Sequence, residues 1–173
     1  MFKKLAVMVI CASSVSPCLA AHWYSFMNAG SNNMAPYLDA DTFVRRGQVV
    51  TFWVQYVYDP TTVVVGTQYS SISKEMYDCS NRTSQDLTTT YYDRDGGVIH
   101  VNSKPSEITD VIPGSVGEAI MESVCRPGTP SKTPDLYMPA LNNDPSKEAS
   151  AVFAKIRAAK AWRAAPVVPA ASQ

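Results

Sequence analysis

The segment QVVTFWVQYVYD, residues 48–59, alternates with a period of two. One set of alternating positions holds Val50, Phe52, Val54, Tyr56 and Tyr58, and the other holds Val49, Thr51, Trp53, Gln55 and Val57. Successive side chains of a strand point to opposite faces of the sheet, and here both faces carry apolar bulk. The pattern therefore predicts a central strand.

Further strand candidates surround this segment and are rich in Thr, Tyr, Val and Ile. They are HWYSFMN, DTFVRR, SSISKEMYDC, QDLTTTYYD and VIHVN. RRGQ and DRDGG mark turns, and Asp95-Gly96 in the second is a strong hairpin signal. About six strands in meander order followed by one helix predict an α+β fold, with a single antiparallel sheet and a C-terminal helix packed on one face. Residues 21–127 suffice for one such core.

The helix is predicted in PGSVGEAIMESVC, residues 113–125. Ser115 and Glu118 form a capping box, and Val116, Ala119, Ile120 and Val124 follow as one apolar stripe. On an ideal helix Cys125 lies to the side of this stripe. We therefore expect the last turn to loosen before the sulfur reaches a partner.

The first twenty residues have the order of a secretory signal peptide. Two lysines precede a short apolar run at 5–12, small residues follow, and cleavage is expected after Ala20. The protein is thus predicted to be exported, either to the periplasm or to the outer membrane and cell surface. Pro17 stands where a lipoprotein signal needs Gly, Ala or Ser, so a lipid anchor on Cys18 is not expected.

Removal of the signal leaves two cysteines, Cys79 and Cys125. In an oxidising compartment such a pair is most simply one disulfide. A metal site or a catalytic thiol is the alternative, but neither cysteine lies in a CxxC motif, and His22 and His100 are the only histidines. No metal and no cofactor are predicted.

No catalytic residue is predicted either. The sequence contains no GxSxG, no HExxH and no phosphate-binding glycine loop. The pairs Asp39/Asp41 and Asp93/Asp95 are interpreted as residues that cap turns. Tyrosines on the predicted strands are expected mainly to pack within the sheet, and an exposed subset would form a binding face.

The chain changes character after the predicted domain. Residues 128–144 are expected to be a Pro-rich linker, and residues 145–173 a basic, Ala-rich tail that is helical from 145 to 164. Residues 21–127 hold 7 Lys and Arg against 12 Asp and Glu, whereas residues 128–173 hold 6 against 3. The tail can therefore dock on its own acidic domain, or meet an anionic membrane surface or cell wall. Nucleic acid is excluded by export. The candidate partner-binding residues are Lys155, Arg157, Lys160, Trp162 and Arg163.

Three segments together resemble the bacterial surface-adhesin protein E family. They are TFWVQYVY, KEMYDCSNRTSQDLTTTYYDRDGGVI and IPGSVGEAIMESVC, and the likeness in order, spacing and both cysteines covers residues 23–125. The resemblance implies an antiparallel sheet whose C-terminal helix is tied to the concave face by a disulfide between Cys79 and Cys125. It also implies attachment of the cell envelope to host proteins, and it does not cover the tail.

These features favour a non-enzymatic envelope protein that binds a macromolecular partner through its sheet face. The partner would be a host matrix protein or an envelope component. The alternative is a periplasmic protein that binds a small ligand in the cavity between a curved sheet and its helix. An enzyme of unrecognised type is the least favoured hypothesis.

Overall fold

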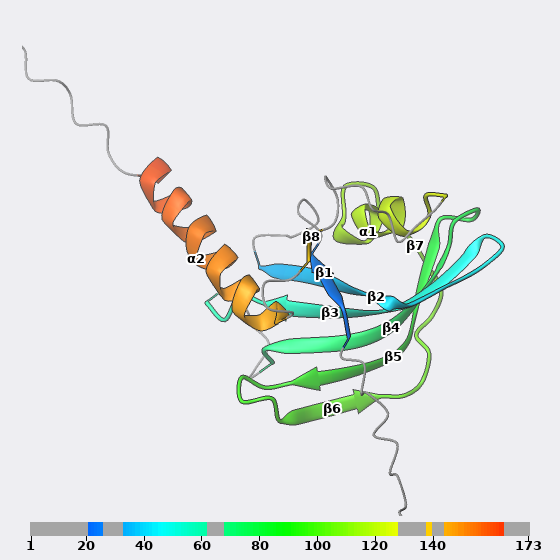
Figure 1. The fold of residues 1–173 in the computed structure, drawn as a ribbon, viewed down its shortest axis with the longest axis horizontal. Coiled ribbons are helices and arrows are strands. Elements are labelled where there is room, and N and C mark those ends of the chain that lie inside the picture. Colours follow the sequence, from blue (N-terminus) through cyan, green and yellow to red (C-terminus); the bar gives the residue numbers. More distant parts are fainter. Residues whose placement is uncertain (1–20, 26–32, 62–67, 128–137, 140–143, 165–173) are drawn as a thin grey trace, which may run out of the picture.

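The computed structural model describes residues 21–25, 33–61, 68–127, 138–139 and 144–164. They form one antiparallel sheet of eight strands and two helices (Figure 1). The strands are β1 Trp23–Ser25, β2 Met34–Arg46, β3 Val49–Tyr58, β4 Ser70–Asp78, β5 Thr83–Tyr92, β6 Val98–Asn102, β7 Thr109–Asp110 and β8 Met138–Pro139. The helices are α1 Val116–Val124 and α2 Pro145–Ala164. The sheet order is β6-β5-β4-β3-β2-β1-β8, and β7 pairs with β5.

The central position predicted for residues 48–59 is confirmed, because β3 lies between β2 and β4 in the middle of the sheet. Val50, Phe52 and Val54 are fully buried on one face, and Val57 is fully buried on the other. Each face has its own cover. We call the face toward α1 the α1-side face and the opposite one the α2-side face.

The α1-side face holds the larger core, in which Ile120, Met121 and Val124 of α1 pack on the sheet. The Phe52 ring stacks on Tyr77, with ring centroids 5.6 Å apart. The start of α1 is capped as expected, since the Ser115 side chain accepts a hydrogen bond from the Glu118 amide at 3.2 Å. The second half of the predicted capping box differs, because the Glu118 carboxylate accepts from the Gly114 amide at 2.7 Å.

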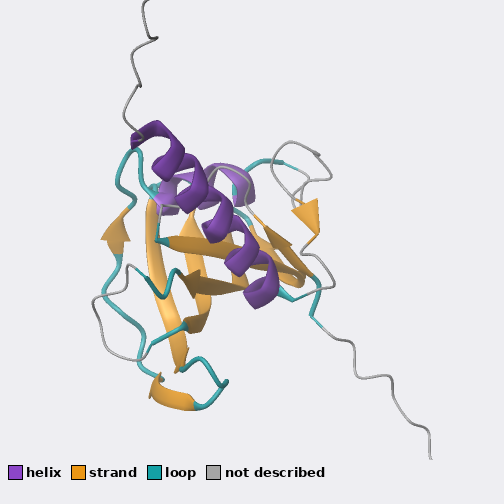
Figure 2. Cartoon of the chain, turned by 90° about the vertical axis from the view of Figure 1, so that its left-hand side faces the viewer, coloured by secondary structure: helices purple, strands orange, loops and turns teal. Residues whose placement is uncertain are grey.

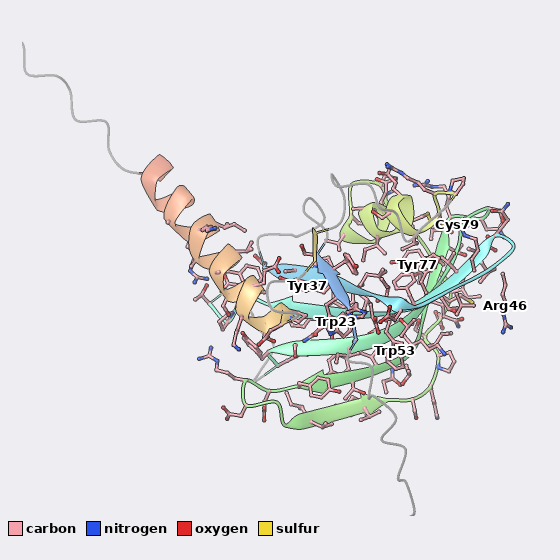
Figure 3. The ribbon with its side chains drawn as sticks, in the orientation of Figure 1. Trp23, Tyr37, Arg46, Trp53, Tyr77 and Cys79 are labelled. Atoms are coloured by element: carbon pink, nitrogen blue, oxygen red, sulfur yellow. A yellow bond between two sulfur atoms is a disulfide. The ribbon has the colours of Figure 1, made fainter. Side chains whose placement is uncertain are left out.

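On the α2-side face, Ala149 and Phe153 of α2 are buried against Tyr37 and Val57. Figure 2 shows α2 lying across this part of the molecule, and in Figure 3 Tyr37 lies near the first turns of α2 while Tyr77 lies toward α1. The fold is therefore a sheet with a helix on each face, where the sequence had predicted one packed helix. Fully buried Phe153 is the apolar anchor of the second helix.

The sheet also has more strands than the six or so predicted. β7 and β8 are only two residues long, too short for a periodic signal. The largest difference is β2, which begins at Met34 although only DTFVRR, from Asp41, was predicted as a strand. Pro36 weakens the strand pattern there, because proline cannot donate a ladder hydrogen bond. It is tolerated just beyond the Tyr37–Asp39 stretch that β1 pairs with.

Candidate functional site

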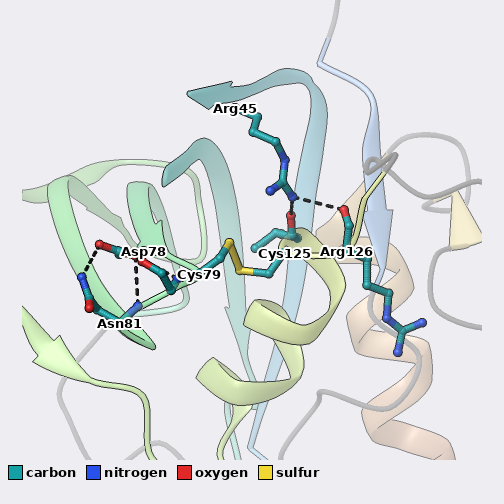
Figure 4. Close-up of a disulfide and its surroundings, with 8 residues drawn as sticks. Arg45, Asp78, Cys79, Asn81, Cys125 and Arg126 are labelled. Carbon is teal, nitrogen blue, oxygen red and sulfur yellow. Dashed lines mark hydrogen bonds between the residues drawn. A yellow bond between two sulfur atoms is a disulfide. The ribbon is translucent and has the colours of Figure 1, made fainter. Parts of the chain in front are cut away.

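The predicted disulfide between Cys79 and Cys125 is confirmed, with Cα atoms 5.5 Å apart (Figure 4). Cys79 directly follows β4 and Cys125 directly follows α1. The expected loosening of the last helical turn is wrong, because the Cys125 amide donates to the Met121 carbonyl at 2.8 Å, as in a regular helix. No unwinding is needed, since the end of β4 already lies beside α1 and Tyr77 packs in the same core.

Polar contacts hold both ends of this bridge. The Arg45 guanidinium donates to the Val124 carbonyl at 2.6 Å and to the Arg126 carbonyl at 3.1 Å, so it satisfies carbonyls at the end of α1. Asp78 accepts from the Asn81 amide at 3.1 Å and from the Asn81 side chain at 2.8 Å (Figure 4). Asn81 thus lies in the exposed turn between β4 and β5. The disulfide and its polar contacts therefore stabilise the fold, and we do not assign them to the candidate site.

A different cluster on the α1-side face has the chemistry of a site. Glu75 of β4 lies directly opposite Asp86 of β5, because the pairing shifts between Lys74 and Glu75. Leu87 is the extra residue of this β-bulge, and it lines a hollow on the other face together with Lys74 and Met76. Bulges of this kind redirect side chains and are frequent at functional sites. Here the bulge brings two carboxyl groups to the same face.

The two carboxyl groups differ in exposure, since Glu75 is buried whereas Asp86 is exposed. Glu75 is 4 % exposed, and burial raises its pKa to about 8, further aided by the charge of Asp86 and opposed by hydrogen bonds from Tyr56 and Tyr77. The Tyr56 hydroxyl donates to Glu75 Oε1 at 2.8 Å. Burial also raises the pKa of Asp86. Near neutral pH, Glu75 is therefore mostly protonated.

Two hollows meet at this pair. One has a volume of about 420 Å³ and extends toward Gln85 and Glu107, and the other has a volume of about 250 Å³ and extends toward α1. Both are lined by Tyr56, Glu75 and Asp86. The smaller hollow is also lined by the side chains Tyr58, Ser71, Ser73, Thr89 and Tyr91. We call this continuous depression the carboxylate hollow.

Edge strand β6 borders the same end of the sheet. All five of its residues are exposed, including Val98 at 59 %, Ile99 at 45 % and Val101 at 51 %. His100 of β6 stacks on Tyr91 of the carboxylate hollow, with ring centroids 6.1 Å apart. β6 is the last strand on its side of the sheet within the described residues. An exposed edge with apolar side chains is a template for contact with another chain.

The predicted tail residues have different positions. The Arg157 guanidinium donates to both carboxylate oxygens of Asp59, at 2.8 and 2.7 Å, whereas Lys155 is exposed. Lys160, Trp162 and Arg163 fall within the span of α2, but their side chains lie outside the described part of the chain. The predicted signal at 1–20 and most of the predicted linker at 128–144 also lie outside it.

Asp59 itself is 2 % exposed. Burial raises the pKa of its carboxyl group, but hydrogen bonds from Thr61 and the contact with Arg157 outweigh burial, so the pKa lies below its usual value. The Asp59 carboxyl group that contacts Arg157 is therefore ionised near neutral pH. Both hydrogen bonds come from one nitrogen of Arg157, Nη1, and charge-assisted bonds of this kind are roughly twice as strong as neutral ones.

The two aspartate pairs behave differently from each other. Asp93 caps the β5–β6 turn as predicted, because its Oδ1 accepts from the Asp95 amide at 2.9 Å and from the Gly97 amide at 2.7 Å. Asp39 also accepts from a backbone amide two residues on, that of Asp41 at 3.1 Å, but it is buried inside β2 at a register irregularity. In the described residues no group of His, Cys, Asp and Glu is arranged to hold a metal ion, and neither helix is long and apolar enough to cross a bilayer.

Sequence reasoning missed the carboxylate hollow. The available signal was the alternating polar set Ser71, Ser73 and Glu75, which continues into Tyr77. The sequence of β5 did not indicate that Asp86 would lie on the same face of the sheet as Glu75. The position of a β-bulge depends on how two strands pair, which neither strand shows alone.

Comparison with known proteins identifies the family. The model of the surface-adhesin protein E family matches residues 23–126, more than half of the chain. Searches of curated proteins and of solved structures gave no match. The matched stretch contains β1 to β7, α1 and both disulfide cysteines, whereas β8 and α2 lie beyond it. The chain therefore belongs to the surface-adhesin protein E family.

Proposed function

We propose that this chain is a non-enzymatic, exported envelope protein that binds a macromolecular partner through the α1-side face of its sheet. The partner is a host matrix protein or a component of the envelope. The single observation that carries the proposal is the carboxylate hollow beside edge strand β6, all of whose residues are exposed. Family membership supports an adhesin-like role.

The composition of this face fits a protein contact. Tyr58 and Tyr91 line the hollow, and His100 of β6 stacks on Tyr91, so aromatic and carboxyl groups lie side by side. Tyrosine is enriched among the residues that dominate interface energies. The acidic balance of the domain and the exposed carboxyl groups of Asp86 and Glu107 in the hollow favour a partner that presents a basic side chain.

The small-ligand alternative uses the space between the sheet and α1. That hollow, bordered by Val116 and Gly117, has a volume of about 250 Å³. The part of the carboxylate hollow beside α1 is thus by itself below the roughly 300–1,000 Å³ typical of small-molecule pockets, and the other part is lined by exposed residues such as Glu107 and is not covered by α1. We therefore rank the macromolecular partner first.

Two experiments test the proposal. Protease treatment of intact cells should digest the protein if it lies on the surface and spare it if it lies in the periplasm. The purified full chain should then bind immobilised matrix proteins in the first case, or isolated envelope fragments in the second.

Variants connect any binding to the proposed face. Tyr91→Ala and Asp86→Ala should each weaken binding about tenfold, since removing a central interface contact costs more than about 1 kcal/mol. Thr90→Ala is the matched control, because Thr90 is adjacent on β5 and faces the other way. Equal binding by all three variants, each folded, would place the contact elsewhere and reject the proposal.

A further inference from the structure

A separate cavity lies on the α2-side face, away from the carboxylate hollow. Its volume is about 680 Å³. One wall is the first turns of α2, with Ser146, Lys147 and Ser150, and the rest comes from strand ends and the β5–β6 turn (Figure 1). The volume is within the range of small-molecule sites.

Several polar side chains in this cavity have no partner among the described residues. They are the amide of Gln55 and the hydroxyl groups of Ser70 and Tyr92. Ser70 is 6 % exposed, so its hydroxyl has lost bulk water without gaining a hydrogen bond from the protein part that the structure describes. A buried polar group of this kind normally finds a partner, and a ligand or bound water is the remaining candidate.

The charged groups around the cavity are mostly occupied. Lys147 pairs with Asp144 at 3.1 Å, and Asp93 is held by the amides of its own turn. Arg94 lies over the Tyr69 ring at 5.9 Å from the centroid, and its guanidinium has no ion-pair partner among the described residues. The cavity thus offers neutral donors and acceptors, one available cation and two tyrosine rings.

We propose that this cavity binds a saccharide of one or two residues. Gln55, Ser70 and Tyr92 can both donate and accept hydrogen bonds, as sugar hydroxyls require. The Tyr69 and Tyr92 rings supply the amphipathic surface for the C–H side of a sugar ring. Arg94 adds recognition of a carboxylate on an acidic sugar. This site goes beyond the proposed partner contact, because it lies on the opposite face of the sheet.

The test is saturation-transfer NMR on the purified full chain with three probes: lactose, N-acetylglucosamine and N-acetylneuraminic acid. Titration calorimetry then gives the affinity of any probe that responds. Ser70→Ala and Tyr92→Phe should each weaken binding roughly two- to tenfold, the loss expected for one hydrogen bond. Arg94→Gln should weaken only the acidic sugar.

Ser123→Ala is the matched control, since Ser123 is also a buried serine but lies on α1, outside the cavity. Tyr92→Phe keeps the ring, so it tests the hydroxyl even if Ser70→Ala fails to fold. Absence of saturation transfer from all three probes would overturn the proposal. So would binding that none of the three cavity variants changes.

Discussion

At the scale of single residues, Glu75 is the most perturbed carboxyl group of the domain. Its pKa of about 8 means that the folded protein retains a proton that a free glutamate loses near its ordinary pKa of 4.5. The contribution of Glu75 to the free energy of unfolding is therefore largest below its ordinary pKa of 4.5. The contribution is lost as the pH rises toward the folded pKa, because the unfolded chain ionises Glu75 while the folded chain resists it.

Glu75→Gln should remove this pH dependence. Between about pH 5 and about pH 8, the free energy of unfolding of the variant should rise relative to the natural protein, by a few kcal/mol at most. Glutamine can still accept the hydrogen bond from Tyr56. Urea unfolding at several pH values measures the effect, with exposed Glu122→Gln as the control. A constant difference between the two proteins would show that Glu75 ionises normally.

The second residue-scale prediction concerns Arg157. Arg157→Met should lower the free energy of unfolding by about 1–3 kcal/mol, because it leaves the Asp59 carboxylate buried without this partner. Lys155→Met is the matched control on the same helix, and it should change stability by less than about 0.5 kcal/mol since Lys155 is exposed. Denaturant unfolding measures both. Equal effects would mean that the contact between Arg157 and Asp59 is absent in solution.

At the scale of elements, α1 is held by three kinds of contact. Ser115 caps its start, and the apolar stripe packs on the sheet. Its end is held by the Cys79–Cys125 disulfide and by the hydrogen bond from Arg45 to the Val124 carbonyl. The short helix could not persist alone, since isolated helices of this length are marginal in water. Its position determines how much of the α1-side face remains open for a partner.

Replacing both cysteines by serine should cost about 2–5 kcal/mol of stability. The reason is the loss of a cross-link between chain positions 46 residues apart, which constrains the unfolded chain. Thermal unfolding measures the loss, and hydrogen exchange should show faster opening of α1. Thiol titration of the denatured, unreduced natural protein should find no free thiol in the mature chain. Two thiols would contradict the bridge.

At the scale of the whole molecule, the family match ends at residue 126, but the sheet includes a strand that lies beyond this residue. β8 pairs with β1 at one edge, and α2 covers Tyr37 and Val57 on the α2-side face. Since α2 lies on the opposite face, it leaves the α1-side face open for the partner contact that we propose. The saccharide cavity that we propose depends on α2 for one of its walls.

Truncation after Pro127 tests what this cover contributes. The remaining chain should stay folded but lose stability, because Tyr37 and Val57 become exposed and the Arg157–Asp59 contact is lost. Part of the loss should persist at high salt, since burial of apolar surface is not screened, and part should shrink. Phe153→Ala in the full chain should cost no more than the truncation, because docking cannot lose more than the whole helix contributes. An unfolded truncated chain would show that α2 is integral to the core.

Features that depend on local periodicity could be predicted from the amino-acid sequence. Alternation in residues 48–59 identified the central strand, Ser115 identified the start of α1, and two remaining cysteines identified the bridge. Each signal lies in neighbouring residues or in a count, so no knowledge of the tertiary fold was needed. The same local rules missed the first half of β2, where Pro36 interrupts them.

The side chains that the two faces of the sheet present depend on contacts between distant parts of the chain. The carboxylate hollow exists because β5 takes one extra residue opposite Glu75, and this register is a property of two strands together. The docking of α2 joins Arg157 to Asp59 across 98 positions of the chain. Charge counts identified a basic tail and an acidic domain, but attraction between net charges has no direction. The contact between Arg157 and Asp59 and the burial of Phe153 fix the orientation of α2, because they require particular atoms to meet.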